Sequence, residues 1–573
     1  MLTFAAQKQE TVPLWFPLKT DNMKKKLTAT YSMSEIDTLA RLMSWSVKHF
    51  PQNLHSRMLD GGSSFTYSDF RDRTSALSET MVSSGIGSGS KIAILSANMP
   101  QWTMAFFSAV AFGRVAVPIL PESSPFEIGN ILKHSGASVL FVSKRLLSNV
   151  PETALESLRL VIDIETFGTV RENASAAVEQ DSANTSDPKP EDLATIIYTS
   201  GTTGKAKGVM LSHINLVSCV HSCYDTHKRD TRDRWLSVLP MAHTLEMSIG
   251  MLYPMLVGAS VHYLSKPPVP SVLLKALKEV RPTTMLIVPL IIEKIYRNSI
   301  IPTIRKSPVL KWMSHHTDKL LCKIIGRKLM KTFGGKIDFL GIGGAKLDIE
   351  VERFLLKAGF PYAVGYGLTE TSPLLSYSTR GIRVPGTIGT AVKGVTLRLA
   401  NMNPETGEGE IVAKGPNVMM GYYKDPERTK AVFTSDGWFR TGDLASEDEC
   451  GRYFIKGRLT NMILGPSGEN IYPEDIEQII NSLDTVNESL VVSRGGKLVA
   501  LVNFNEDAID WNREGEAEFF RKIEDYKSRI LEFVNKNVKK TSKVSDVQVM
   551  REPFEKTATK KIRRFKYTDR TGL

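Results

Sequence analysis

The 573-residue chain is poor in cysteine, and its four thiols exclude a disulfide-stapled scaffold and fit a reducing compartment. It also lacks the run of about 18 apolar residues that a membrane-spanning helix needs. The best candidate, residues 235–264, is interrupted by His243, Glu246 and Pro254. The first residues have neither the charged start nor the apolar core of a signal peptide. We therefore expect a cytoplasmic protein that is not integral to a membrane.

Strand-like apolar runs alternate with helical patterns in the first part of the chain, which predicts parallel α/β sheets. The runs are residues 91–96, 115–120, 139–142, 160–164 and 193–198, with a helical stretch at 101–113. Residues 383–457 have short runs and many glycines, which favours a small β-rich subdomain. The last 110 or so residues mix strands with amphipathic helices. We predict an α/β fold with a large N-terminal domain (1–459) and a small mobile α+β C-terminal domain (460–573).

The most informative segment is residues 196–213, in which a strand ending at Tyr198 opens into glycines, hydroxyls and lysines. Glycines let backbone N–H groups approach an anion closely, and the hydroxyl and amine side chains add hydrogen-bond donors. We therefore expect a polyphosphate as the ligand. The spacing is not that of a P-loop, because two residues separate Gly201 from Gly204. An ordinary surface turn is the alternative. The candidate nucleotide-binding residues are Thr199, Ser200, Gly201, Thr202, Thr203, Gly204 and Lys205.

These eighteen residues resemble the phosphate-loop signature of the adenylate-forming enzymes: acyl-CoA synthetases, peptide-synthetase adenylation domains and luciferases. Further segments resemble the motifs of this family in the same order along the chain. They are Pro240–Glu246, Gly343–Ala345, Tyr366–Thr371, Trp438–Asp443, Lys456–Arg458, Gly468–Glu477 and Lys556–Ile562. Taken singly, most of these residues have ordinary structural explanations; their joint order is what carries the resemblance.

The resemblance implies a role for each matched residue. Gly344, Ala345, Tyr366 and Gly367 would bind adenine, Asp443 and Arg458 the ribose, and Thr369 phosphate, while Glu370 would be the Mg²⁺ ligand and Lys561 the catalytic lysine. Charge builds up when a carboxylate attacks the α-phosphate, so a hard oxygen ligand and fixed cations suit this chemistry. Thr460 and Gly468 would lie at the domain hinge and beside CoA. Lys560 stands where most relatives have glycine.

The acid substrate is expected to be apolar. Met241 and His243 occupy the segment that resembles the acyl gate, and Thr244 stands where an amino-acid-activating relative would carry an aspartate. Residues 288–297 look most like the long-chain fatty acyl-CoA synthetases. The implied reaction joins a fatty acid to CoA through an acyl-adenylate, with ATP and Mg²⁺. The alternatives are an acyl-carrier-protein ligase, a ligase for another apolar acid, or a catalytically silent binding protein.

A basic segment, residues 297–336, holds ten Lys and Arg residues against one Asp. Nucleic acid, an anionic membrane or a phosphorylated ligand could each explain such a charge. Apolar residues recur from Leu310 to Leu329 mostly at spacings of three and four, as on one face of an interfacial helix. A helix packed on the enzyme with solvated lysines is the alternative. We expect no nucleic acid, and a peripheral association of this segment with the inner face of the membrane as the functional hypothesis.

Overall fold

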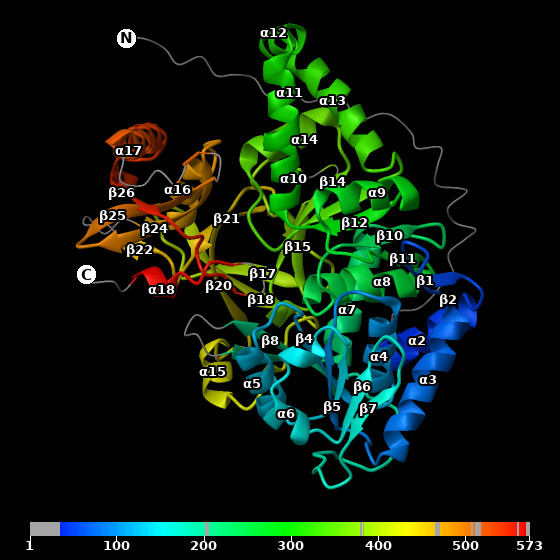
Figure 1. Cartoon of the computed structure of the whole chain (residues 1–573). Helices are drawn as coiled ribbons and strands as arrows, with labels where there is room; N and C mark the ends of the chain where they lie inside the picture. Colours follow the sequence, from blue (N-terminus) through cyan, green and yellow to red (C-terminus); the bar gives the residue numbers. More distant parts are fainter. Residues whose placement is uncertain are drawn as a thin grey trace, which may run out of the picture.

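The computed structural model describes residues 35–200, 206–378, 381, 383–464, 470–505, 508–509, 511, 517–557 and 561–568, with Ser200 and Ala206 as backbone only (Figure 1). Of the predicted site, Gly201, Thr202, Thr203, Gly204, Lys205 and Gly468 lie outside the described residues. In the described part, no helix combines the length and apolar character needed to span a bilayer.

The first sheet has eight strands in the order β19-β9-β8-β4-β3-β5-β6-β7, and its centre is parallel as predicted. The predicted strands form within a few residues of their expected ends. The strands are β3 (Lys91–Leu95), β4 (Val115–Ile119), β5 (Ala137–Val142), β6 (Leu160–Asp163), β7 (Thr169–Glu172), β8 (Leu193–Ser200), β9 (Ala206–Ser212) and β19 (Gly421–Tyr422). The helices between them are α4 (Pro100–Val110), α5 (Pro125–Ser135) and α6 (Glu152–Glu156).

The second sheet has nine strands in the order β16-β15-β14-β13-β12-β10-β11-β1-β2. Its strands are β1 (Leu54–Met58), β2 (Ser64–Thr66), β10 (Arg234–Ser237), β11 (Ser260–Tyr263), β12 (Thr284–Ile287), β13 (Phe339–Ile342), β14 (Tyr362–Gly367), β15 (Leu374–Ser378) and β16 (Thr390–Ala391). Its helices are α2 (Leu39–His49), α3 (Tyr67–Ser83), α7 (His213–Thr226), α8 (Tyr253–Val257), α9 (Pro270–Val280), α10 (Pro289–Ile295) and α14 (Ile349–Ala358).

A four-stranded antiparallel sheet follows, as predicted for residues 383–457. It contains β17 (Thr396–Ala400), β18 (Glu408–Lys414), β20 (Phe439–Glu447) and β21 (Tyr453–Arg458), with α15 (Pro426–Ala431) between two of them. The C-terminal part is α+β. It contains β22 (Ile463–Leu464), β23 (Asn470–Ile471), α16 (Pro473–Ile480), β24 (Val486–Arg494), β25 (Lys497–Phe504), α17 (Ala517–Asn537), β26 (Val544–Met550) and α18 (Phe565–Thr568). The α/β fold class with a smaller C-terminal domain is therefore confirmed.

Two local expectations were wrong. Thr199 and Ser200 belong to β8 rather than to a loop, because β8 pairs with β9 in an antiparallel hairpin that continues to these residues. The apolar residues from Leu310 to Leu329 do not lie on one helical face, because the chain leaves the helical conformation at Thr317. The segment instead forms α11 (Ile301–Lys306), α12 (Pro308–His316) and α13 (Asp318–Thr332), which lie together at one extremity of the molecule (Figure 1).

Candidate active site

Tyr366, Asp443 and Arg458 meet at the C-terminal end of β14. The Tyr366 hydroxyl donates to Asp443 Oδ2 at 2.8 Å, and Arg458 Nε lies 3.0 Å from Asp443 Oδ1. The register of the antiparallel pair β20–β21 places Asp443 opposite Arg458, which explains why two residues fifteen positions apart share a site. The structure thus assembles the predicted adenine-binding tyrosine and the two predicted ribose-binding residues in one corner.

The electrostatics of this corner come from burial. Asp443 is buried, and desolvation raises the pKa of its carboxyl above the usual value even though Arg458 and Tyr366 oppose that effect. Burial, and then the Asp443 charge, raise the pKa of the Tyr366 hydroxyl well above its usual range. Asp443 therefore has strong acceptor oxygens already oriented by two donors, which suits the recognition of sugar hydroxyls.

Glu370 lies at the start of the turn after β14 and is held by two groups from other elements. Lys207 Nζ in β9 donates to Glu370 Oε1 at 2.7 Å, and the Tyr422 hydroxyl in β19 donates to the same oxygen at 2.9 Å. Burial is the largest single effect and raises the pKa of the Glu370 carboxyl, but the Lys207 charge and the hydrogen bonds to the carboxylate, including those from Lys207 and Tyr422, together outweigh it, and the net pKa is lowered. Glu370 is therefore an anion at neutral pH.

The Glu370 carboxylate fits the role of a magnesium ligand. Among the described residues, the two hydrogen bonds that it accepts from other residues, those of Lys207 and Tyr422, fall on Oε1, so these bonds leave the second oxygen for a cation. In the described part of the chain no three His, Cys, Asp or Glu side chains come together as a metal cluster. A single carboxylate suits Mg²⁺, which keeps several waters and takes further ligands from substrate phosphates. A metal here would be shared between Glu370 and a nucleotide.

Lys561 of the C-terminal domain faces this site. Its ammonium group interacts with Arg458, Asp443 and Glu370, which come from the large domain. Lys561 is exposed to solvent, yet the protein around its ammonium group partly desolvates it. This desolvation, together with the Arg458 charge, lowers the pKa of Lys561. The structure therefore brings the predicted catalytic lysine to the predicted nucleotide-binding residues.

Two glycine-rich turns form the edge of the site. Gly344 has a φ of +85°, and Gly344 and Ala345 are exposed in the turn that follows β13. Gly367 ends β14 so close to the next strand that an added Cβ would lie 1.6 Å from the Pro373 carbonyl oxygen. Only glycine fits at position 367. Thr369, which follows, is half-buried in the short turn Thr369–Thr371.

The predicted acyl gate, His243, lies on the loop before the π-helix η2 (Glu246–Leu252). Burial lowers the pKa of His243 to about 4, with the Lys561 charge as a second cause. The ring is therefore neutral, and its Nδ1 accepts from the Leu245 N–H at 3.2 Å. Asn98 fixes the start of the same loop, because it accepts from the Met241 N–H at 2.8 Å and donates to the Leu239 carbonyl.

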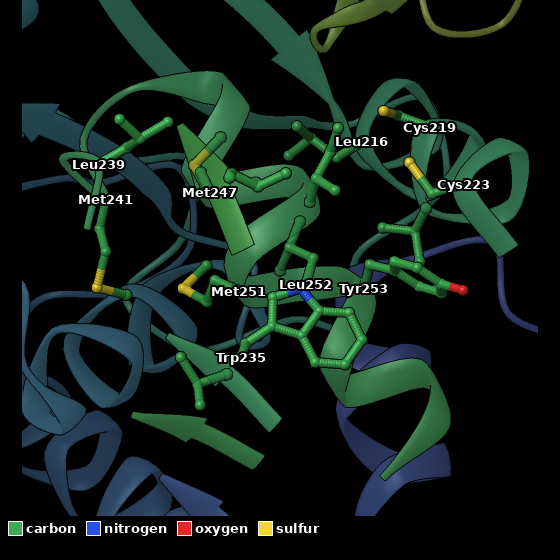
Figure 2. Close-up of a cluster of buried hydrophobic side chains, with 14 of the residues drawn as sticks. Leu216, Cys219, Cys223, Trp235, Leu239, Met241, Met247, Met251, Leu252 and Tyr253 are labelled. Carbon is green, nitrogen blue, oxygen red and sulfur yellow. The ribbon is translucent and has the colours of Figure 1, made fainter. Parts of the chain in front are cut away.

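A methionine-rich apolar cluster lies beside this loop (Figure 2). Met241, Met247 and Met251 are almost fully buried and pack with Trp235. Glu246 is buried next to this cluster, and burial raises the pKa of its carboxyl to about 8, partly offset by a hydrogen bond from Ser237. Glu246 is therefore mostly neutral at pH 7, and the gate segment presents no charge to an incoming acyl chain. Met241 packs in the core beside the predicted gate.

The remaining predicted residues are distributed as follows. Thr199 is the second-last residue of β8 and lies opposite Lys207 in β9, and its buried hydroxyl has no hydrogen-bond partner in the described part of the chain. Thr460 is exposed in the turn directly after β21, where the chain passes into the C-terminal part. The sequence analysis missed Lys207 and Tyr422 as site residues. A predicted hairpin of the two neighbouring strands could have identified Lys207 as the neighbour of Thr199. No pattern in the local sequence pointed to Tyr422.

Comparisons with known proteins match most of the chain. The AMP-binding enzyme family matches residues 44–423, and the AMP-binding enzyme C-terminal domain matches residues 461–570. The long-chain-fatty-acid–CoA ligase FadD15 of Mycobacterium bovis is 29% identical over 523 residues, 84% of each chain. Peroxisomal long chain acyl-CoA synthetase 6 of Arabidopsis thaliana is 29% identical over 78% of this chain and 69% of its own.

Among solved structures, ATP-bound MatB from Rhodopseudomonas palustris has a TM-score of 0.73 at 24% identity, over 92% of this chain and 99% of its own. The O-succinylbenzoate CoA synthetase MenE of Bacillus subtilis, in complex with ATP and magnesium ion, has a TM-score of 0.72 at 20% identity, over 91% and 98%. These likenesses show the shared fold of adenylate-forming enzymes. The chain belongs to the AMP-binding enzyme family.

Proposed function

We propose that this AMP-binding enzyme is an acyl-CoA ligase that converts a long-chain fatty acid to acyl-adenylate and then to acyl-CoA. In the first step a carboxylate oxygen of the acid attacks the α-phosphorus of ATP and pyrophosphate leaves. In the second step the CoA sulfur attacks the acyl carbonyl carbon and AMP leaves. The observation that carries the proposal is the meeting of Lys561 with Asp443, Arg458 and Glu370 in one site.

We assign each group a task in the first step. Asp443 and Arg458 bind the ribose hydroxyls, with Tyr366 against the adenine and Gly344 and Ala345 at its edge. Lys561 places a positive charge near the attacking carboxylate, and its pKa is lowered first by desolvation and then by the Arg458 charge. Thr199 to Lys205 and Thr369 bind the phosphates. Magnesium held by Glu370 would neutralise charge on the phosphate oxygens.

The apolar surroundings of the gate support a fatty acid as the substrate. His243 is neutral, Glu246 keeps its proton at pH 7, and Met241, Met247 and Met251 are buried beside them. A free amino group on the substrate would find no carboxylate in this segment. The named ligases for long-chain fatty acids among the relatives point the same way. MenE, which is named for O-succinylbenzoate, has the same fold, so the fold does not select the acid and the long chain is part of the proposal.

The acceptor is CoA rather than an acyl carrier protein. Thr460 and Gly468 belong to the part of the chain that we assign to the hinge and to the pantetheine arm, with the domain boundary between Leu459 and Thr460. The C-terminal domain would rotate about this hinge between the two steps. Thioester formation with CoA, compared with holo-carrier protein at equal concentration, decides the acceptor; a clear preference for the carrier protein would contradict this assignment.

The two lysines near the C-terminus give the sharpest test of the site. Lys561→Ala should lose most acyl-adenylate formation, measured by acid-dependent ATP–pyrophosphate exchange. The same variant should still form thioester from supplied acyl-adenylate and CoA, because Lys561 serves only the first step. Lys560→Ala is the matched control and should keep far more exchange activity. Equal loss of both half-reactions in Lys561→Ala, or an exchange of behaviour between the two variants, would contradict the assignment.

We also propose that helices α11 to α13 bind an anionic membrane surface, from which long-chain acids are extracted. Val309, Trp312, Leu320 and Ile324 are large apolar side chains exposed by 66%, 57%, 54% and 43%. Leu320 and Ile324 lie one turn apart on the outer face of α13, while Leu321 and Leu329 on its other face are buried. Cations flank the exposed face: Lys311, Lys319, Lys323, Arg327 and Lys328, none of which forms an ion pair within the described part of the chain.

Each lysine or arginine near an anionic surface contributes about 1 kcal/mol, so four engaged charges would give salt-sensitive binding. The protein should co-sediment with anionic liposomes at low salt and be released at high salt. Replacing Lys319, Lys323, Arg327 and Lys328 with Glu should weaken this binding and leave activity on a short soluble acid unchanged. Wild-type protein that stays in the supernatant at low salt, or a variant that binds equally well, would make this segment an ordinary surface.

A further inference from the structure

An ion pair joins the loop of Lys561 to the large domain. Arg563, two residues after Lys561, places its Nη2 2.9 Å from Oε1 of Glu127, a residue 436 positions earlier in the first turn of α5. The two side chains are 19% and 29% exposed. Glu127 belongs to the large domain and Arg563 to the C-terminal domain, so this contact joins the two domains.

The pair differs from the other charged contacts between the domains. Among the described residues, two further ion pairs join the chain before residue 460 to the chain after it. They are Arg305 with Asp484 and Lys346 with Asp475, and all four of these side chains are 42% to 68% exposed. Exposed pairs contribute about 0–1 kcal/mol because solvent screens them, whereas partly buried pairs are screened much less.

Glu127 is held in place before Arg563 arrives. It forms a capping box with Ser124, in which Glu127 Oε2 accepts from the Ser124 N–H at 2.9 Å and from its hydroxyl at 3.1 Å. These two bonds leave Oε1 turned to Arg563. A carboxylate fixed by its own helix loses little conformational entropy when the ion pair forms, so the pair has a firm geometry.

Arg563 is tied in turn to the loop that carries Lys561. Its backbone N–H donates to the Glu555 carbonyl at 2.8 Å, and its Nε lies 3.3 Å from the Glu555 carboxylate. Within the same loop the Thr557 N–H donates to the Lys561 carbonyl at 2.8 Å, and Lys556 pairs with Ile562. Arg563 and Lys561 therefore belong to one hydrogen-bonded loop, so the position of Arg563 restricts the position of the Lys561 backbone.

We propose that the Glu127–Arg563 pair is an interdomain clamp that holds the C-terminal domain in the adenylate-forming orientation and so positions Lys561. Both members are positioning residues that act through Lys561. The clamp contributes to adenylate formation alone, because the domain rotation that brings CoA into the site separates the pair. The inference rests on the proposed two-step function and names two residues that this function does not require.

The test is a double-mutant cycle measured on both half-reactions. Glu127→Gln keeps an oxygen for the Ser124 cap but removes the charge, and Arg563→Ala removes its partner. Each should slow acid-dependent ATP–pyrophosphate exchange about 5- to 20-fold, which lies between the effects of exposed and buried pairs. The double variant should be no slower than Arg563→Ala, because the two residues act as one unit. Thioester formation from supplied acyl-adenylate should stay at the wild-type rate in all three.

Asp484→Asn is the matched control, since it breaks an exposed interdomain pair and should change neither half-reaction. Thermal unfolding of Glu127→Gln should follow the wild type, which shows that α5 keeps its cap. Additive losses in the double variant, or equal loss of both half-reactions, would overturn the clamp. A wild-type enzyme with no acid-dependent exchange would contradict the proposed function instead, so the two failures can be told apart.

Discussion

Glu246 offers a quantitative test of the apolar character of the gate. Its carboxyl is buried at the start of the π-helix η2 and packs against Gly250, where an added Cβ would lie 2.6 Å from the carboxyl carbon. Burial raises the pKa of Glu246 from 4.5 to about 8. The unfolded chain therefore releases this proton at a lower pH than the folded protein does.

The sign of the stability effect follows from that difference. Between pH 4.5 and about 8 the unfolded state binds fewer protons at Glu246, so stability falls as the pH rises through this window. One pKa unit corresponds to about 1.4 kcal/mol, which makes the cost on the order of 3 kcal/mol at pH 7. Glu246→Gln has a similar shape and does not titrate. It should match the wild type near pH 5 and be more stable than the wild type at pH 8.

The assay is the difference in unfolding midpoint between Glu246→Gln and the wild type from pH 5 to 8.5. Buried histidines such as His55, His213 and His262, whose pKa values burial lowers to about 3, 4 and 4, also change stability with pH. They are common to both proteins and cancel in the difference. The variant should also keep acid-dependent AMP formation at pH 7, because the replaced group is mostly neutral there. Two curves that stay parallel over the whole range would refute the reasoning.

Two further predictions concern the Glu370 site. Glu370→Gln should shift the Mg²⁺ dependence of adenylate formation to higher concentration, because the anion that holds the cation is lost; an unchanged Mg²⁺ titration would mean that Glu370 has a structural role. Lys207→Met leaves the buried Glu370 charge without its cation, at a cost of about 3 kcal/mol or ~3 °C in the unfolding midpoint. Lys207→Met with Glu370→Gln should recover most of that loss, and a double variant that is less stable than Lys207→Met would show that the two side chains do not act as a pair.

Local patterns predicted most of the fold. The strands of the first sheet are continuous apolar runs buried on both faces, and β3 to β6 appear where those runs lie. The ends were less certain, since the continuation of β8 through Thr199 and Ser200 depends on hydrogen bonds from β9. The break at Thr317 was missed because the apolar spacing alone does not show where a helix turns away to bury Leu321 and Leu329.

Candidate site residues could be predicted where they lie within a short sequence motif, as Glu370, Asp443 and Lys561 do. The partners of these residues come from distant parts of the chain. Tyr422 reaches Glu370 only because β19 pairs with β9, about 210 residues earlier. The local sequence around Glu127 predicts only a helix cap. It does not predict that the second carboxylate oxygen of Glu127 binds Arg563. Long-range pairing of this kind leaves no periodic signal in one sequence.

The measurement that tests the central claim most directly is AMP release with CoA across saturated acids from short to very long. The account predicts AMP formation that requires both the acid and CoA and is most efficient, by kcat/KM, with long-chain acids. Release of AMP that does not depend on the acid, or a preference for short or dicarboxylic acids over long-chain ones, would contradict it.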